Sequence, residues 1–170
     1  GQHQKELSKI LREVAHRHGL WQVFSDFLAM SALSISNAVD LRQYDKREAE
    51  YMQIVGRYTK AEACLIAHCL GHVVIGLEEG PQDFLGSLFM SLELGNDWAG
   101  QFFTPYEISL MMAKMQLGGD HAKRIIAERG FITVNDPCTG GGAMLIAAAH
   151  ALQDEGLNHS QQMHATAKDI

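Results

Sequence analysis

The sequence has few of the residues that mark a disulfide-stabilised or membrane-embedded protein. Its 170 residues include three cysteines, an odd number without a Cys-x-x-Cys pair, which indicates reduced thiols rather than a disulfide framework. No window holds about 18 uncharged apolar residues, so we expect no membrane span and no membrane partner. The first residues lack the apolar core of a signal peptide, and we therefore expect a cytoplasmic protein.

Positive charge is also scarce, and it is unevenly placed. Residues 1–60 hold nine Lys and Arg against seven Asp and Glu, whereas residues 61–170 hold five against thirteen. A free-standing nucleic-acid-binding protein usually carries a basic patch. If this protein acts on DNA, we expect the DNA to be held mostly by regions outside this chain.

The first part of the chain has only helical periodicity. Thr59 and Glu62 have the spacing of a capping box, and so do Asp45 and Glu48. Gly80 and Pro81 mark a break. We expect helices over 4–18, 21–38, 46–57, 60–78 and 83–94. These ranges predict an N-terminal helical domain over 1–97 and a second domain over 98–170.

The second part changes character at a β-branched and aromatic run, 131–134, which predicts a short buried strand. A glycine-rich turn and a helix over 142–155 follow, and 164–168 can form a second strand. This order predicts one βαβ unit with parallel strands. Before it we expect helices over 105–116, with Thr104 as N-cap and Pro105 at the first position, and over 120–129, closed by Gly130.

Residues 135–145, NDPCTGGGAML, place bare backbone between the strand and the following helix. Such a turn lets a ligand approach backbone N–H groups. A P-loop needs Lys and Ser or Thr after the last glycine, where Ala143 and Met144 stand. A dinucleotide fold wants a third spaced glycine, where Leu145 stands. S-adenosylmethionine needs no phosphate-gripping lysine, and the acid Asp136 suits its ammonium and sulfonium charges.

The same residues carry a family resemblance. NDPCTGGG, 135–142, resembles the D-P-x-x-G-x-G motif of N6-adenine DNA methyltransferases, and GQFFTP, 100–105, resembles their G-x-[FY]-[FY]-T-P motif. The pair in this order is specific, and it is most similar to the modification (M) subunit of type I restriction-modification systems. AKDI, 167–170, resembles the start of the family's G-x-D-I-D segment. The resemblance covers roughly 83–170.

The resemblance implies a fold, a cofactor and partners. The fold is a mainly α N-terminal helical domain followed by the start of an α/β Rossmann-like SAM-dependent methyltransferase domain, with one βαβ unit and an incomplete sheet. The cofactor is S-adenosyl-L-methionine, and the partners are DNA and a specificity subunit. The implied cofactor-binding residues are Phe103, Thr104 and Pro105 at the methionine end, Asp136, Pro137, Thr139, Gly140 and Gly142 around the amino acid part, and Asp169 at the ribose.

The chain departs from the family in one decisive way. The family's catalytic [DNS]-P-P-[YFW] loop needs adjacent prolines, but the three prolines here are Pro81, Pro105 and Pro137. We therefore expect no catalytic residue in this chain, which we interpret as an inactive, truncated piece of the enzyme. With the rest of the sheet missing, Phe131, Ile132 and Val134 should be left exposed, and we expect self-association or local disorder in 131–170. The alternatives are a non-enzymatic truncated paralogue acting as a binding or regulatory module, and a nucleotide-binding regulator.

Other residues allow competing interpretations. Cys64, His68 and His72 share one helix face at a spacing that metal ligands can use. Their apolar neighbours and the absence of an HExxH carboxylate favour core or surface histidines, so we expect no metal. Cys138 has no base near it in the sequence, and we expect a buried thiol. Asp136 could also serve as a simple helix cap.

Overall fold

The computed structural model describes residues 1–94 and 103–169, and its contacts divide the chain into two compact units, Gly1–Glu78 and Glu79–Ile170. We call them the N-terminal unit and the C-terminal unit. The predicted domain boundary between residues 97 and 98 lies outside the described residues, so it stays a prediction.

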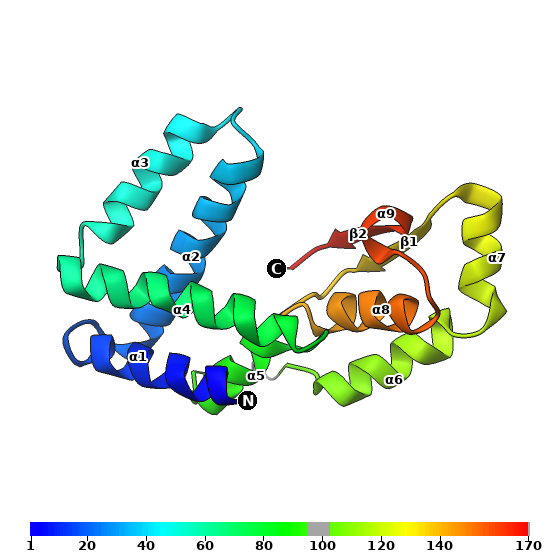
Figure 1. The fold of residues 1–170 in the computed structure, drawn as a ribbon, viewed down its shortest axis with the longest axis horizontal. Coiled ribbons are helices and arrows are strands. Elements are labelled where there is room, and N and C mark those ends of the chain that lie inside the picture. Colours follow the sequence, from blue (N-terminus) through cyan, green and yellow to red (C-terminus); the bar gives the residue numbers. More distant parts are fainter. Residues whose placement is uncertain (95–102, 170) are drawn as a thin grey trace. The chain divides into compact units, whose positions relative to one another are not determined.

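The N-terminal unit consists of helices, as the periodicity predicts (Figure 1). In it α1 packs against α2 and α4, and α2 packs against α3. Its buried side chains are mostly large aliphatic and aromatic residues of α1, α2 and α4, with Leu7, Leu11, Val23, Phe27 and Ile66 nearly inaccessible. The helices are α1 (Gln2–His18), α2 (Leu20–Val39), α3 (Tyr44–Val55) and α4 (Lys60–Glu78).

The two predicted capping boxes have different outcomes. The one before α4 is confirmed, because the Thr59 backbone N–H donates to Glu62 Oε2 at 2.8 Å and the Glu62 N–H donates to Thr59 Oγ1 at 3.3 Å. The one before α3 is wrong. Gln43 stands at that N-cap, and Asp45 lies inside the first turn, where its carboxylate still faces the positive end of the helix dipole.

A buried acid stabilises the polar centre of this unit. Asp26 on α2 is 4% exposed, and it accepts hydrogen bonds from Arg57 Nη1 at 2.9 Å, Tyr58 Oη at 2.7 Å and Gln22 Nε2 at 2.9 Å. Burial and the neighbouring Asp26 carboxylate raise the pKa of Tyr58, so the phenol stays a donor. Through these bonds Asp26 ties α2 to the turn between α3 and α4.

One helix among the described residues, α4, is long and apolar enough to cross a membrane by length and composition alone, although we expected none. Its most apolar window has a mean hydropathy of 1.4, and 22% of that window is buried. In the structure α4 packs against α1 and α2. A single helix of this kind is weak evidence for a membrane span, because core helices pass the same test.

In the C-terminal unit, α8 lies between α6 and the strands (Figure 1). Small side chains, Ala147, Ala148 and Ala151, make up much of the buried face of α8, and Ala113 faces the same core from α6. Small residues let helices approach closely, which explains this tight pairing. The elements are α5 (Phe84–Ser91), α6 (Tyr106–Leu117), α7 (Asp120–Arg129), β1 (Ile132–Asp136), α8 (Ala143–Asp154), α9 (His159–Gln162) and β2 (Met163–Ala167).

The two strands are parallel, with Ile132 opposite Met163 and Asp136 opposite Ala167. The predicted βαβ order is therefore confirmed in this part of the chain. Gly130 closes α7 in the left-handed conformation, as expected. The expectation that Ile132 is exposed is wrong: it is 6% exposed, because it points into the core under α8. Phe131, just before the strand, is 46% exposed.

We predict that the C-terminal unit associates with other copies through the open edge of β1. Among the described residues β1 pairs only with β2, and a cavity of about 340 Å³ runs along Thr133–Pro137. An unpaired strand edge beside apolar surface is a template for further pairing. Light scattering should show concentration-dependent association that Thr133→Lys reduces. A clean monomer with slow amide exchange throughout 131–169 would contradict the prediction.

Candidate cofactor site

The candidate site forms where the two parallel strands end. The Lys168 backbone N–H donates to the Asp136 carbonyl at 2.9 Å, and the Thr139 N–H donates to the Lys168 carbonyl at 3.0 Å. Thr139 Oγ1 also donates to the Asp136 carbonyl at 3.0 Å and accepts from the Lys168 N–H at 3.1 Å. The carboxyl ends of parallel strands are where open α/β sheets bind ligands. These bonds bring the glycine loop next to the segment that contains Asp169.

The glycine loop turns sharply between β1 and α8. Gly140 and Gly142 have φ angles of +51° and +84°, and the Gly142 N–H donates to the Thr139 carbonyl at 2.8 Å. Residues other than glycine rarely adopt these backbone angles. Within the described part of the chain, the N–H groups of Gly140 and Gly141 have no hydrogen-bond partner. The loop therefore offers two backbone donors at the N-terminus of α8 to a ligand.

Phe103 lies directly against this loop. A Cβ atom added at Gly140 would be 3.3 Å from Phe103 Cδ1, and one added at Gly141 would be 3.2 Å from Phe103 Cδ2. On its other side the Phe103 ring contacts the Phe89 ring, with centroids 4.9 Å apart. The two motifs that are separated by about thirty residues in the sequence thus meet in the structure.

Asp136 has one carboxylate oxygen engaged and one unpaired. Its Oδ1 accepts from the Cys138 N–H at 3.1 Å, which shapes the loop, whereas Oδ2 is buried and has no partner among the described residues. Burying a carboxylate oxygen without a partner is costly. The interpretation of Asp136 as a helix cap is wrong, because Gly142 occupies the N-cap of α8.

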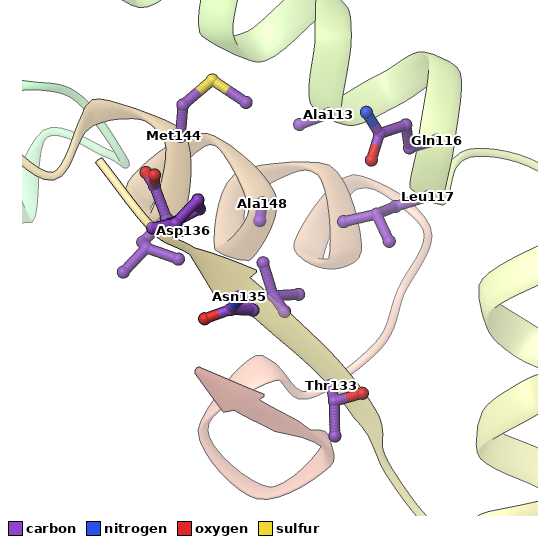
Figure 2. Close-up of a pocket in the computed structure, with 11 residues that line it drawn as sticks. Ala113, Gln116, Leu117, Thr133, Asn135, Asp136, Met144 and Ala148 are labelled. Carbon is purple, nitrogen blue, oxygen red and sulfur yellow. The ribbon is translucent and has the colours of Figure 1, made fainter. Parts of the chain in front are cut away.

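A cavity of about 340 Å³ continues from Asp136 along β1, between α6 and α8 (Figure 2). Figure 2 shows the Asp136 carboxylate at one end, near Met144, and Thr133 at the other. Its walls include the apolar residues Leu117, Val134, Leu145 and Ala148. Asp136 is therefore the charged residue at one end of a largely apolar cavity.

Not every predicted residue lies where the sequence suggested. Thr104 and Pro105 are exposed, and α6 begins one residue later than predicted, at Tyr106, with Pro105 in the N-cap position and no side-chain cap. Pro137 is exposed as well, and Phe102 lies outside the described residues. The expected burial of Cys138 is wrong, because its thiol is exposed. The cofactor-binding roles themselves stay predictions.

The structure adds a contact that the sequence analysis missed. The Tyr106 hydroxyl lies 2.8 Å from His150 Nδ1, and the two rings are nearly parallel. His150 is in turn 3.6 Å from Asp154, which Lys114 contacts at 2.6 Å. Burial raises the pKa of Tyr106, and the hydrogen bond from Lys114 lowers the pKa of Asp154. This chain of contacts fixes the start of α6, and with it the Phe103 segment, against α8. No local pattern signals it, because the partners are 44 residues apart.

A known protein family matches the second part of the chain. Residues 91–169 match the family described as N-6 DNA Methylase. The matched segment contains both motifs, the glycine loop and Asp169, and it supports the N6-adenine methyltransferase family for this part of the chain. No curated protein and no solved structure matches the chain significantly.

Proposed function

We propose that the C-terminal unit forms half of the S-adenosylmethionine site of an adenine-N6 DNA methyltransferase. The observation that carries the proposal is the unpaired, buried Asp136 oxygen beside two unpaired glycine N–H groups. The cofactor's methionine end carries an ammonium group, a sulfonium group and a carboxylate. A buried acid suits the first two, and backbone donors at a helix N-terminus suit the third. The residues present therefore fit this cofactor.

The remaining residues take roles that follow from their positions. Phe103 would cover the loop on its α5 side, Thr139 would hold the loop to the end of β2, and Asp169 would accept hydrogen bonds from the ribose hydroxyls. The cofactor supplies the methyl group that the enzyme class transfers to the N6 nitrogen of adenine. In that class the adenine is flipped out of the duplex and held by a Pro-Pro-aromatic loop. Because this chain has no adjacent prolines, it contributes cofactor binding and positioning only.

We also propose the kind of system in which this methyltransferase acts. The motif pair suits the modification subunit of a type I restriction system, acting in the cytoplasm with a specificity subunit. Rossmann-like architecture would require further parallel strands, and the open edge of β1 with its cavity is where one could be added. DNA would be bound mainly by regions beyond this chain, since residues 61–170 hold five basic and thirteen acidic residues.

The test compares the chain with a longer version that continues through the Pro-Pro-aromatic loop. Calorimetry should show that the longer version binds S-adenosylmethionine and that the chain alone binds it roughly a hundredfold more weakly, because the groups that hold the adenine ring would come from the added segment. Only the longer version should transfer labelled methyl groups to DNA adenine. A longer version that binds NAD or ATP but not S-adenosylmethionine would overturn the proposal.

The absence of a Pro-Pro pair favours a second candidate, a truncated paralogue that acts as a binding module. The reading frame separates the two. A frame that continues after Ile170 into a Pro-Pro-aromatic segment supports the enzyme, and a stop codon there supports the module.

A further inference from the structure

Two histidines from helices far apart in the sequence meet in the N-terminal unit. His3 on α1 and His72 on α4 have their Nδ1 atoms 3.0 Å apart and their ring centroids 5.3 Å apart. Both side chains are half-buried. The helices that carry them pack against each other, and both have buried side chains, Leu7 and Leu11 on α1 and Val73 on α4, so the pair lies on two packed helices and not on a loop.

The distance between the two nitrogens matches that between neighbouring ligands of one metal ion. Imidazole nitrogens bind Zn²⁺ at about 2.0–2.1 Å. Two nitrogens at that distance from one ion and 3.0 Å from each other subtend about 94° at the ion. This is near the right angle of square-planar and octahedral sites, which Ni²⁺ and Cu²⁺ prefer.

We propose that His3 and His72 form a two-imidazole site for a divalent transition metal, which clips α1 to α4. Without metal, one Nδ1–H donates to the other Nδ1. When the ion binds, the proton of the donor ring moves from Nδ1 to Nε2, so that both Nδ1 lone pairs are free for the ion and each ring stays neutral. Because both rings are only half-buried, water can complete the coordination. Imidazole nitrogen is a common ligand of Ni²⁺, Cu²⁺ and Zn²⁺.

The site differs from the one that the sequence suggested. Cys64 and His68 lie on α4 about two turns and one turn before His72, respectively, but both are exposed. The part of the chain that the structure describes contains no group of three or more His, Cys, Asp or Glu side chains that could hold a metal ion. Of the three residues that the sequence suggested, only His72 takes part, and His3 of α1 supplies the second ligand.

The test titrates the whole chain with nickel chloride and follows the ¹⁵N signals of the imidazole rings and the heat of binding. One equivalent should bind, with the largest changes at His3 and His72. His3→Gln and His72→Gln should each weaken nickel binding at least about tenfold. Replacing even a residue that only hydrogen-bonds to a metal ligand typically costs about that much in metal affinity. His68→Gln is the matched control on the same helix, and it should bind nickel like the unaltered chain.

Two outcomes would overturn the proposal. One is nickel binding of unchanged affinity in His72→Gln, because the ion would then be held without α4. The other is an unaltered chain that does not saturate with one equivalent. Amide exchange at Leu11 and Val73 shows whether each variant keeps the α1–α4 packing. If His72→Gln fails to fold, the nickel titration of His3→Gln decides the question, because His3 lies in the first turn of α1. Copper EPR of the unaltered chain is the second measurement. Two equatorial nitrogen ligands are expected, and one or none would contradict the site.

Discussion

Replacing Asp136 with asparagine or alanine is expected to abolish S-adenosylmethionine binding while leaving both units folded. The measurement is calorimetry on a version of the protein extended through the Pro-Pro-aromatic loop. The carboxylate is the acid at the glycine loop, and a hydrogen bond to a charged group contributes about 1.5–3 kcal/mol. Its loss corresponds to a weakening of roughly ten- to 150-fold, which places binding near or below detection.

The two substitutions separate charge from loop shape. Asparagine keeps an oxygen that can accept from the Cys138 N–H, whereas alanine removes that bond as well. If the charge recognises the cofactor, both variants lose binding; if the residue only shapes the loop, asparagine retains it. Because Asp136 Oδ2 is buried without a partner, Asp136→Asn should not lower the stability of the C-terminal unit. Glu128→Ala on α7 removes the same charge from an exposed site and is the control. Unchanged affinity in both Asp136 variants would refute the assignment of the loop.

The second large effect is expected at Asp26→Ala, which should destabilise the N-terminal unit by about 2–4 kcal/mol. The substitution leaves the buried Tyr58 hydroxyl without its acceptor and the Arg57 guanidinium without its counter-ion. Removing one partner of a buried ion pair typically costs about 3–5 kcal/mol. Because the Arg57 side chain is 46% exposed, water can solvate its charge, and we therefore expect a smaller cost of about 2–4 kcal/mol.

Amide exchange during urea titration distinguishes the two units in one sample. The amides of Val23 and Phe27 report on the N-terminal unit, and that of Ala147 reports on the C-terminal unit. Asp26→Ala should speed exchange at the first two and leave the third unchanged. Tyr58→Phe removes one hydrogen bond and should cost about 1 kcal/mol. Glu50→Ala on the exposed face of α3 is the control, expected within about 0.5 kcal/mol. A stability of Asp26→Ala equal to that of the control would show that the buried cluster contributes nothing.

Most helices and the strand order could be predicted because their signals are local. The Thr59–Glu62 box, the left-handed Gly130 and the β-branched run at β1 each act within a few residues of the element they define. The errors are also local in origin. The structure starts α3 at Tyr44, two residues before the predicted start, and α6 at Tyr106, one residue after it, and such shifts are within the usual uncertainty of helix ends.

The sequence alone determined the chemical character of the candidate site, because loop shape and charge sign depend on residue type. It specified the bare glycine loop, the acid before it and the missing proline pair. Only the tertiary structure decided which of these residues meet. Phe103 lies on the glycine loop, Asp136 keeps an unpaired oxygen, Tyr106 contacts His150, and His3 meets His72. The contacts of Phe103, Tyr106 and His3 join positions 37 to 69 residues apart, and their formation depends on how α6, α8 and the strands, or α1 and α4, pack. Packing of that kind is set by the summed burial of many side chains, which no short stretch of sequence encodes.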